Sequence, residues 1–86
     1  MFYTYIIWNE THQKYYVGYT HNLTARERQH NDPSNTFSKY TKKFSGKWTI
    51  IYSEEHDSQK IAMQRERELK SGKGREWIKC HILPGC

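Results

Sequence analysis

Two short runs rich in β-branched and aromatic residues open the chain. Residues 2–8, FYTYIIW, and residues 14–20, KYYVGYT, have the composition of β-strands. We expect residues 9–12 to form a four-residue hairpin loop, which places Tyr5 opposite Tyr16. Opposed residues of an antiparallel pair project from the same face, so the two phenols would be neighbours. A slip of one residue would place them on opposite faces.

A polar stretch with capping residues follows the second run. Asn22 is the expected N-cap of a helix that runs to about His30, and residues 31–33, Asn-Asp-Pro, end it. Residues 34–47 show no regular pattern and are expected to form a long loop. The run 48–54, WTIIYSE, predicts a third strand.

Two further helices are expected after the third strand. Asp57 or Ser58 would cap the first, which continues to about Ser71 and is stopped by Gly72. Residues 75–79, REWIK, predict a short final helix. The order β-β-α-β-α-α indicates a small α/β fold in which helices flank a short, mainly antiparallel sheet of three strands.

Composition and charge narrow the classes of protein that this pattern fits. The 86 residues leave room for one domain with a modest core. Aromatic residues make up 15% of the chain, which argues against disorder and suggests that Tyr and Trp supply much of the core. With 14 Lys and Arg against 9 Asp and Glu, the formal charge is +5. This surplus favours a polyanionic partner, although many basic domains bind none.

The start of the chain and its two cysteines favour a reduced, cytoplasmic setting. The opening residues, MFYTYIIWNE, lack the basic region and the small-residue cleavage site of a secretion signal. No apolar run reaches membrane-spanning length, so no membrane partner is expected. Cys80 and Cys86 match neither a disulfide framework nor a metal motif, and a bridge between them would stabilise only the tail.

Arg26 and His30 are the first residues that point to chemistry. They are four apart and therefore share a helix face, which Leu23 is expected to anchor to the sheet. Neither offers a carboxylate to the other, so they form a poor structural pair but a good pair for an oxyanion such as phosphate. On the local pattern alone, the favoured alternative is that Arg26 pairs with a nearby acid and His30 caps a strand end.

Glu66 lies at the border of an apolar helix face. The inward face of this helix is expected to hold Ile61, Ala62, Arg65 and Leu69. A partly desolvated carboxylate needs a positive partner. That partner is either Lys70, in an i,i+4 ion pair worth about 0.3–0.5 kcal/mol, or a divalent cation that keeps several waters and relies on substrate phosphate. The local pattern favours the ion pair.

The tyrosines and the lysines of the long loop carry weaker signals. A strand tyrosine usually packs, and a phenol with a pKa of about 10 needs nearby positive charge before it can act as a base. The loop of residues 34–47 holds four lysines and no carboxylate, and by default it is a solvated surface. Phe37, Tyr40 and Phe44 alternate with these lysines, a mixture that suits contact with phosphates and stacking on bases or sugars.

Together these residues resemble the signature of the GIY-YIG nuclease superfamily. The matching positions are Tyr3-Thr4-Tyr5, Tyr16-Val17-Gly18, Arg26, His30 and Glu66. Only the last residue of the first triplet is retained, because Tyr and Thr replace its Gly and Ile. Within the superfamily, the chain is most similar to small stand-alone endonucleases related to the nuclease domain of excinuclease C. The resemblance covers residues 1–80 and leaves residues 81–86 as a short tail.

The resemblance implies a metal-dependent hydrolysis of phosphodiester bonds, in DNA rather than RNA, and a role in DNA repair. It implies that Tyr5 and Tyr16 are active-site phenols, either of which could accept a proton from the attacking water. It also implies that Arg26 contacts the scissile phosphate, that His30 supports it and that Glu66 binds Mg²⁺ or Mn²⁺. The expected contacts to the nucleic-acid backbone are Lys39, Lys42, Lys43, Lys70, Lys73 and Arg75. A protein partner could supply specificity.

Two other classes of function stay open. The first is a catalytically inactive, basic nucleic-acid-binding module of the same fold, which would show salt-sensitive binding without any effect of metal. The second is a structural or protein-interaction domain whose basic surface meets an acidic partner. Failure to bind nucleic acid at low salt would favour that second class.

Overall fold

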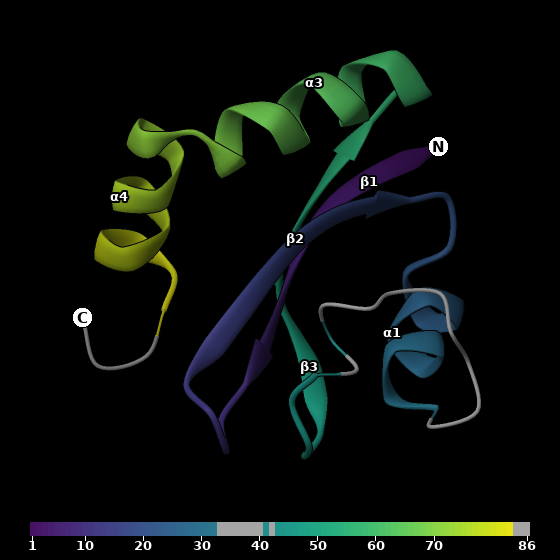
Figure 1. The fold of residues 1–86 in the computed structure, drawn as a ribbon. Helices are drawn as coiled ribbons and strands as arrows, with labels where there is room; N and C mark the ends of the chain where they lie inside the picture. The colour runs from purple at the N-terminus through teal and green to yellow at the C-terminus, as the bar shows by residue number, and fades with distance from the viewer. Residues whose placement is uncertain (33–40, 42, 84–86) are drawn as a thin grey trace.

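The structure, a computed structural model, describes residues 1–32, 41 and 43–83. The elements in this part of the chain are β1 (Phe2–Asn9), β2 (Lys14–Thr20), α1 (Leu23–Asn31), β3 (Trp48–His56), α3 (Gln59–Lys70) and α4 (Gly72–His81). The strands form one antiparallel sheet in the order β2-β1-β3 (Figure 1). The predicted α/β fold and its order of elements are therefore confirmed.

The pairing of β1 with β2 is shifted by two residues from the predicted register. Tyr5 lies opposite Gly18 instead of Tyr16, and Tyr16 lies opposite Ile7. Because side chains alternate between faces with a period of two, a shift of two residues keeps both phenols on the same face. The predicted partner is wrong, but the predicted closeness of the two rings survives.

The shift arises at the hairpin loop, which is made of residues 10–13. Asn9 belongs to the strand, where its side-chain amide donates to the Ser45 carbonyl at 2.9 Å and its Oδ1 accepts the His12 N–H at 3.0 Å. Gln13 turns the chain with a φ of 56°, a left-handed conformation that side chains other than glycine seldom adopt. No glycine marks this turn, so the sequence could not locate it.

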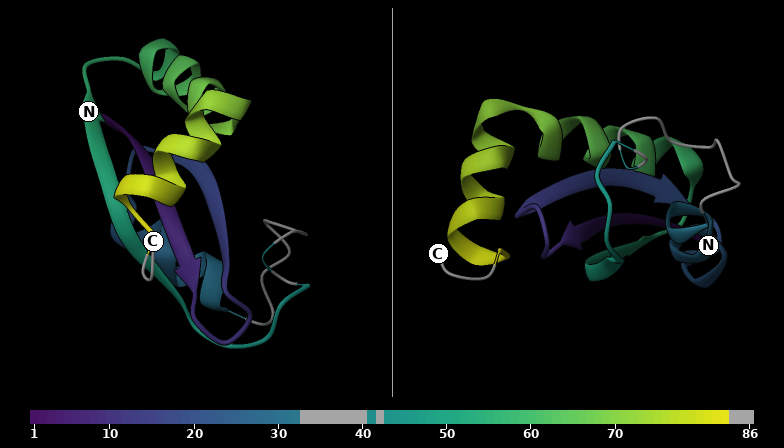
Figure 2. Two further views of the ribbon diagram at one scale, coloured as in Figure 1. Left: turned by 90° about the vertical axis from the view of Figure 1, so that its left-hand side faces the viewer. Right: turned by 60° about the horizontal axis from the view of Figure 1, so that its bottom comes forward.

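Helices cover both faces of the sheet (Figure 2). On one face, α3 and α4 pack against a core of Ile6, Val17, Leu69 and Ile78. On the other face, α1 packs through Leu23, as predicted, against a second core of Tyr5, Ile7 and Trp48. The central strand β1 therefore supplies both cores.

A bulge in β3 divides its side chains between the two cores. The register shifts between the Ile6–Tyr52 pair and the Ile7–Ile50 pair, which leaves Ile51 as the extra residue. Ile50 consequently packs on the α1 side, whereas Ile51 and Tyr52 pack on the α3–α4 side. The bulge thus turns the second half of β3 toward α3.

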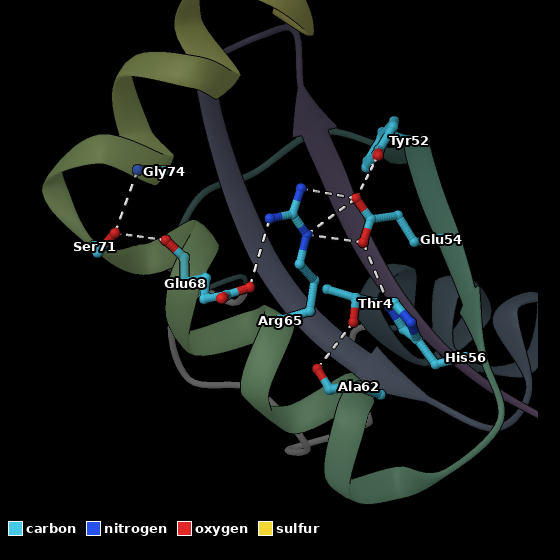
Figure 3. A network of polar contacts seen from close by, with 9 residues as sticks. All are labelled: Thr4, Tyr52, Glu54, His56, Ala62, Arg65, Glu68, Ser71 and Gly74. Carbon is cyan, nitrogen blue, oxygen red and sulfur yellow. Dashed lines mark hydrogen bonds and ion pairs between the residues drawn. The ribbon is translucent and has the colours of Figure 1, made fainter.

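An ion-pair network fixes α3 to this half of β3 (Figure 3). The Arg65 Nε donates to both carboxylate oxygens of Glu54, at 2.9 and 3.1 Å, and Nη2 adds a contact of 3.0 Å. The Tyr52 hydroxyl donates to the same carboxylate, and the Arg65 guanidinium lies 5.5 Å from the centre of the Trp77 ring. Burial alone would raise the pKa of Glu54, but the hydrogen bonds from Arg65 and Tyr52 outweigh it and hold that pKa below its usual range.

The buried face of α3 is narrower than predicted. Ala62 and Leu69 are buried as expected, but Ile61 is 47% exposed, so its assignment to the inward face is wrong. The Thr4 hydroxyl donates to the Ala62 carbonyl at 2.9 Å, which brings the helix close to β1 at this point. Ile61 lies about 100° round the helix from Ala62 and is turned away from the sheet.

The predicted N-caps of the first two helices are confirmed. The Asn22 side chain accepts the Ala25 N–H at 3.0 Å at the start of α1. Ser58, rather than Asp57, caps α3 and accepts the Ile61 N–H at 3.3 Å. Each cap satisfies a backbone donor that has no partner inside its helix.

The final helix is longer than the predicted residues 75–79, because α4 begins at Gly72. The chain breaks instead at Ser71, whose extended backbone ends α3 and whose Oγ accepts the Gly74 N–H at 3.3 Å. A Cβ atom at Gly74 would lie 2.2 Å from the Glu68 carbonyl oxygen. This glycine therefore permits the close approach of α4 to α3, and the expectation that Gly72 stops a helix is wrong.

Candidate active site

A cleft of about 410 Å³ lies at the edge of the sheet beside β2. Because β2 is an edge strand, side chains from helices on opposite faces of the sheet can meet around it. Four of the five residues predicted to form the site line this cleft: Tyr5, Tyr16, Arg26 and Glu66. They come from β1, β2, α1 and α3, so the fold brings together positions that are far apart in the sequence.

His30 stands behind the cleft and does not line it. Its side chain is buried, with Nε2 2.9 Å from the Tyr5 hydroxyl and Nδ1 3.0 Å from the Thr41 hydroxyl. The Thr41 carbonyl in turn accepts the Trp48 indole N–H at 3.1 Å. His30 therefore holds the Tyr5 hydroxyl through one ring nitrogen and the Thr41 hydroxyl through the other.

The environment of Tyr5 keeps its phenol protonated. Burial raises the pKa of Tyr5 well above its ordinary value, Arg26 lowers it in part, and Tyr16 and Glu66 raise it further. The neutral phenol shares a hydrogen bond with His30 Nε2, and the tautomer of His30 decides which of the two groups donates. Tyr5 thus serves as a fixed hydrogen-bonding group.

Gly18 makes room for this phenol. A Cβ atom at Gly18 would lie 2.6 Å from the Tyr5 hydroxyl oxygen and 2.7 Å from Cζ. The ring of Tyr5 therefore rests directly on the backbone of β2, at the residue it faces across the ladder. The glycine of the second triplet has a steric role that is visible in the structure.

Glu66 has the i,i+4 partner that the sequence offered, and it also lines the cleft. Its Oε2 lies 3.5 Å from the Lys70 Nζ, and its side chain is 19% exposed. Lys70 is more exposed, at 46%, and its Nζ lies 5.2 Å from the centre of the Tyr16 ring. A long, half-exposed lysine can turn to solvent, so the ion pair leaves the carboxylate accessible to another cation.

Helix α1 is held in place by side chains that bond to the backbone of β3. Asn31 donates to the Trp48 carbonyl at 2.8 Å and accepts the Trp48 N–H at 2.7 Å. Glu27 accepts the Ile50 N–H at 2.8 Å. Glu27, the acid next to Arg26 in the sequence, is therefore turned toward β3, and Arg26 is directed into the cleft.

Several groups at this site were not predicted from the sequence. Thr41, which orients His30, lies in a segment without a regular pattern and carried no signal. The cleft is also lined by Tyr19, His21 and Gln59, of which Gln59 donates to the Tyr19 hydroxyl at 3.4 Å. The one signal available for this set was the position of Tyr19, which directly follows Gly18 of the second triplet on β2.

The residues predicted to contact nucleic acid differ in where the structure places them. Lys39 and Lys42 lie outside the described residues, as do the ring residues Phe37 and Tyr40 and the tail residue Cys86. A second hollow lies beside the cleft, between β2 and α4, and Lys70 and Arg75 line it. Lys43 and Lys73 are exposed and line neither the cleft nor this second hollow.

The cleft offers a metal ion a single carboxylate ligand. Of the described residues that line the cleft, Glu66 alone carries a carboxylate. No group of three His, Cys, Asp or Glu side chains comes together as a metal site in residues 1–32, 41 and 43–83. Magnesium commonly uses one or two carboxylates together with waters and substrate phosphates, so a single carboxylate at an open cleft fits such an ion.

Comparison with known proteins decides the family. The model of the family described as the GIY-YIG catalytic domain matches residues 1–79. The chain belongs to the GIY-YIG family. No curated protein and no solved structure gives a significant match. The GIY-YIG family consists of endonucleases, so membership indicates a hydrolase that acts on nucleic acid.

The sequence of this GIY-YIG domain predicted that no segment would span a membrane. In the part of the chain that the structure describes, no helix has both the length and the apolar character needed to cross a bilayer. The predicted cytoplasmic location stays a prediction.

Proposed function

We propose that this GIY-YIG domain is a metal-dependent endonuclease that hydrolyses phosphodiester bonds in DNA. The observation that carries the proposal is the cleft itself, which collects Tyr16, Arg26 and Glu66 from three elements. These side chains offer a proton acceptor, a cation for the phosphate and a ligand for a divalent ion. Such a combination is what phosphodiester hydrolysis requires.

Tyr16 is the better candidate for the general base. It is half-exposed, it lines the cleft, and the Lys70 ammonium lies over its ring. Tyr5 is buried, its pKa is raised, and its hydroxyl is engaged by His30. A base must release and accept a proton near neutrality, so the phenol with nearby positive charge and access to water is favoured.

Arg26 supplies the charge that the transition state needs. Its guanidinium reaches the cleft from α1, whose orientation is fixed by the bonds to β3. A planar guanidinium can donate two parallel hydrogen bonds to phosphate oxygens. The loss of one such preorganised donor typically lowers the rate by about 10²–10³-fold.

Glu66 would hold Mg²⁺ or Mn²⁺, with Lys70 released from the carboxylate. When bound there, the ion supplies Lewis-acid charge that stabilises the departing oxygen. Tyr5 lines the cleft, and the bond between its hydroxyl and His30 holds this part of the cleft wall in place.

Replacement of Glu66 by Gln tests the proposal. The change keeps the shape of the side chain and removes the charge that holds the ion. We expect the wild-type domain to nick supercoiled plasmid in the presence of Mg²⁺ or Mn²⁺, and Glu66→Gln to lower that rate by about 10²-fold or more. The rate of conversion to the open circle measures the effect, and a filter-binding assay should show that DNA is still bound.

Glu68→Gln is the matched control. Glu68 lies on the same helix, is exposed, and pairs only with Arg65 at 3.6 Å among the described residues, away from the cleft. Its replacement should leave nicking unchanged. A wild-type domain that binds DNA but never nicks it with either metal would favour the inactive binding module, and full activity in Glu66→Gln would contradict the assigned role of this carboxylate.

A further inference from the structure

A second hollow, of about 530 Å³, lies between the outer edge of β2 and α4. We call it the β2–α4 groove. Its cationic lining residues are Lys14, Lys70, Arg75 and Lys79. Strand β2 also contributes Tyr15 and Tyr16 to the lining, and in the described part of the chain none of the lining residues is acidic.

The groove adjoins the proposed catalytic cleft. Tyr16 lines both hollows, and Lys70 lines the groove while pairing with Glu66, which lines the cleft. An extended chain that occupies the cleft and leaves it past Tyr16 would therefore enter the groove directly.

Two of the four cations of the groove lack a structural explanation within the described chain. Lysine on an edge strand can discourage pairing with another sheet, and Lys14 could serve that purpose. Arg75 and Lys79 cannot, because they come from α4, where they stand four residues apart on one helix face. Like charges at this spacing destabilise a helix, and among the described residues neither side chain has an ion-pair partner.

From this arrangement we infer that the β2–α4 groove binds the backbone phosphates that flank the scissile one on one side of a DNA strand. The inference rests on the function proposed for the cleft, and it extends the substrate path by the length of the groove. Cations that follow an extended hollow suit a polyanionic chain, and Tyr15 offers an aromatic surface at its wall. Lys14 and Lys79, which the sequence pattern did not single out, become phosphate contacts.

A charge-reversal pair tests the groove. We expect Lys14→Glu with Lys79→Glu to weaken binding of a fluorescein-labelled 30-base-pair DNA duplex by about tenfold or more. The slope of the logarithm of affinity against the logarithm of salt concentration should fall by about 2, because each lost phosphate contact removes about 0.9. Fluorescence anisotropy in EDTA measures both, and a 30-nucleotide single strand is titrated in parallel.

Arg28→Glu with Lys47→Glu is the matched control. These two cations line a different hollow beside α1, and their reversal changes the net charge by the same amount. If this control weakens binding as much as the groove variant, the effect is one of overall charge and the inference is overturned. Unchanged affinity and salt slope in the groove variant would overturn it as well.

The measurement separates this inference from the proposed activity. Binding in EDTA involves no cleavage, so a domain that never cuts DNA would still reveal whether the groove holds it. Circular dichroism shows whether each variant is folded. If the Glu pair does not fold, Lys14→Gln with Lys79→Gln replaces it, and the expected weakening is then about fivefold.

Discussion

At the residue scale, the two phenols of the cleft have different surroundings although they lie on one face of the sheet. Tyr5 is buried and hydrogen-bonded to His30, while Tyr16 is half-buried beside Lys70. The two phenols thus differ both in burial and in the charge that lies beside them. Only the residue that water can reach is suited to exchange a proton with it.

Tyr16→Phe and Tyr5→Phe should therefore affect different properties of the domain, the first its nicking rate and the second its stability. Tyr16→Phe should lower plasmid nicking by about 10²-fold with little change in the free energy of unfolding. Tyr5→Phe should destabilise the fold by about 1–3 kcal/mol, because it leaves a buried nitrogen of His30 without its partner. Nicking rates and urea unfolding of both variants measure the contrast, and equal stability losses would contradict it.

The stability that the Tyr5 hydroxyl contributes should depend on pH. The pKa of Tyr5 is raised in the folded state, so its contribution to stability is complete below about pH 10, the range of an ordinary phenol, and is lost as the pH rises further. The stability advantage of the wild type over Tyr5→Phe, measured by urea unfolding across this range, should therefore shrink above about pH 10. Tyr52, whose pKa is also raised by burial and by its bond to Glu54, leaves some alkaline sensitivity in both proteins.

At the scale of the elements, the junction of α3 and α4 depends on one glycine and not on the other. A Cβ atom at Gly74 would overlap backbone atoms of Glu68 and Leu69, at 2.2 and 2.5 Å, whereas one at Gly72 would meet no atom within 4 Å. The two glycines stand two residues apart, yet only Gly74 lies in the contact between the helices.

Gly74→Ala should consequently destabilise the domain by about 2–4 kcal/mol, since backbone atoms cannot yield as a flexible side chain would. Gly72→Ala is the control, and it should be neutral or stabilising by up to about 1 kcal/mol, because alanine favours helix. Thermal unfolding of the two variants measures the difference. Similar melting temperatures would show that α4 does not approach α3 as described.

The elements also show what the sequence could predict. Composition located the three strands, and Asn22 and Ser58 marked helix starts because a capping side chain acts on its own local backbone. The hairpin register and the bulge at Ile51 escaped prediction, since the first depends on an unusual Gln13 conformation and the second on packing from both faces. Features set by neighbouring residues could be predicted from the sequence, whereas features set by packing between distant residues could not.

The candidate site follows the same division. The family signature selected Tyr5, Tyr16, Arg26 and Glu66, and the fold collects all four in one cleft. Thr41 could not be selected, because its role comes only from its contact with a buried histidine. Lys14 and Lys79 were overlooked because one begins a strand and the other is one of many lysines, and only the fold places them together.

At the scale of the whole molecule, the single sheet links the two helical layers. Ile6 and Ile7 are neighbours on β1, are both fully buried, and belong to different cores. Neither core can form without this strand. The domain should therefore unfold as one cooperative unit, although its helices lie on opposite faces.

Leu69→Ala tests this coupling from the α3–α4 side. Truncation of this buried leucine should cost about 2–5 kcal/mol and shift the whole transition. The Trp48 indole N–H, which bonds to Thr41 on the other face, offers a separate probe by NMR. Its signal and the far-UV circular dichroism should vanish at the same urea concentration in wild type and variant, and separate midpoints would mean that the two layers unfold independently.

The position of the cleft at a sheet edge governs which bonds can be reached. Such a site is open sideways, and a polymer can be laid against it at any point along its length. Nothing has to be threaded from a terminus. A covalently closed circle, which offers no terminus at all, is for this geometry as good a substrate as a linear fragment.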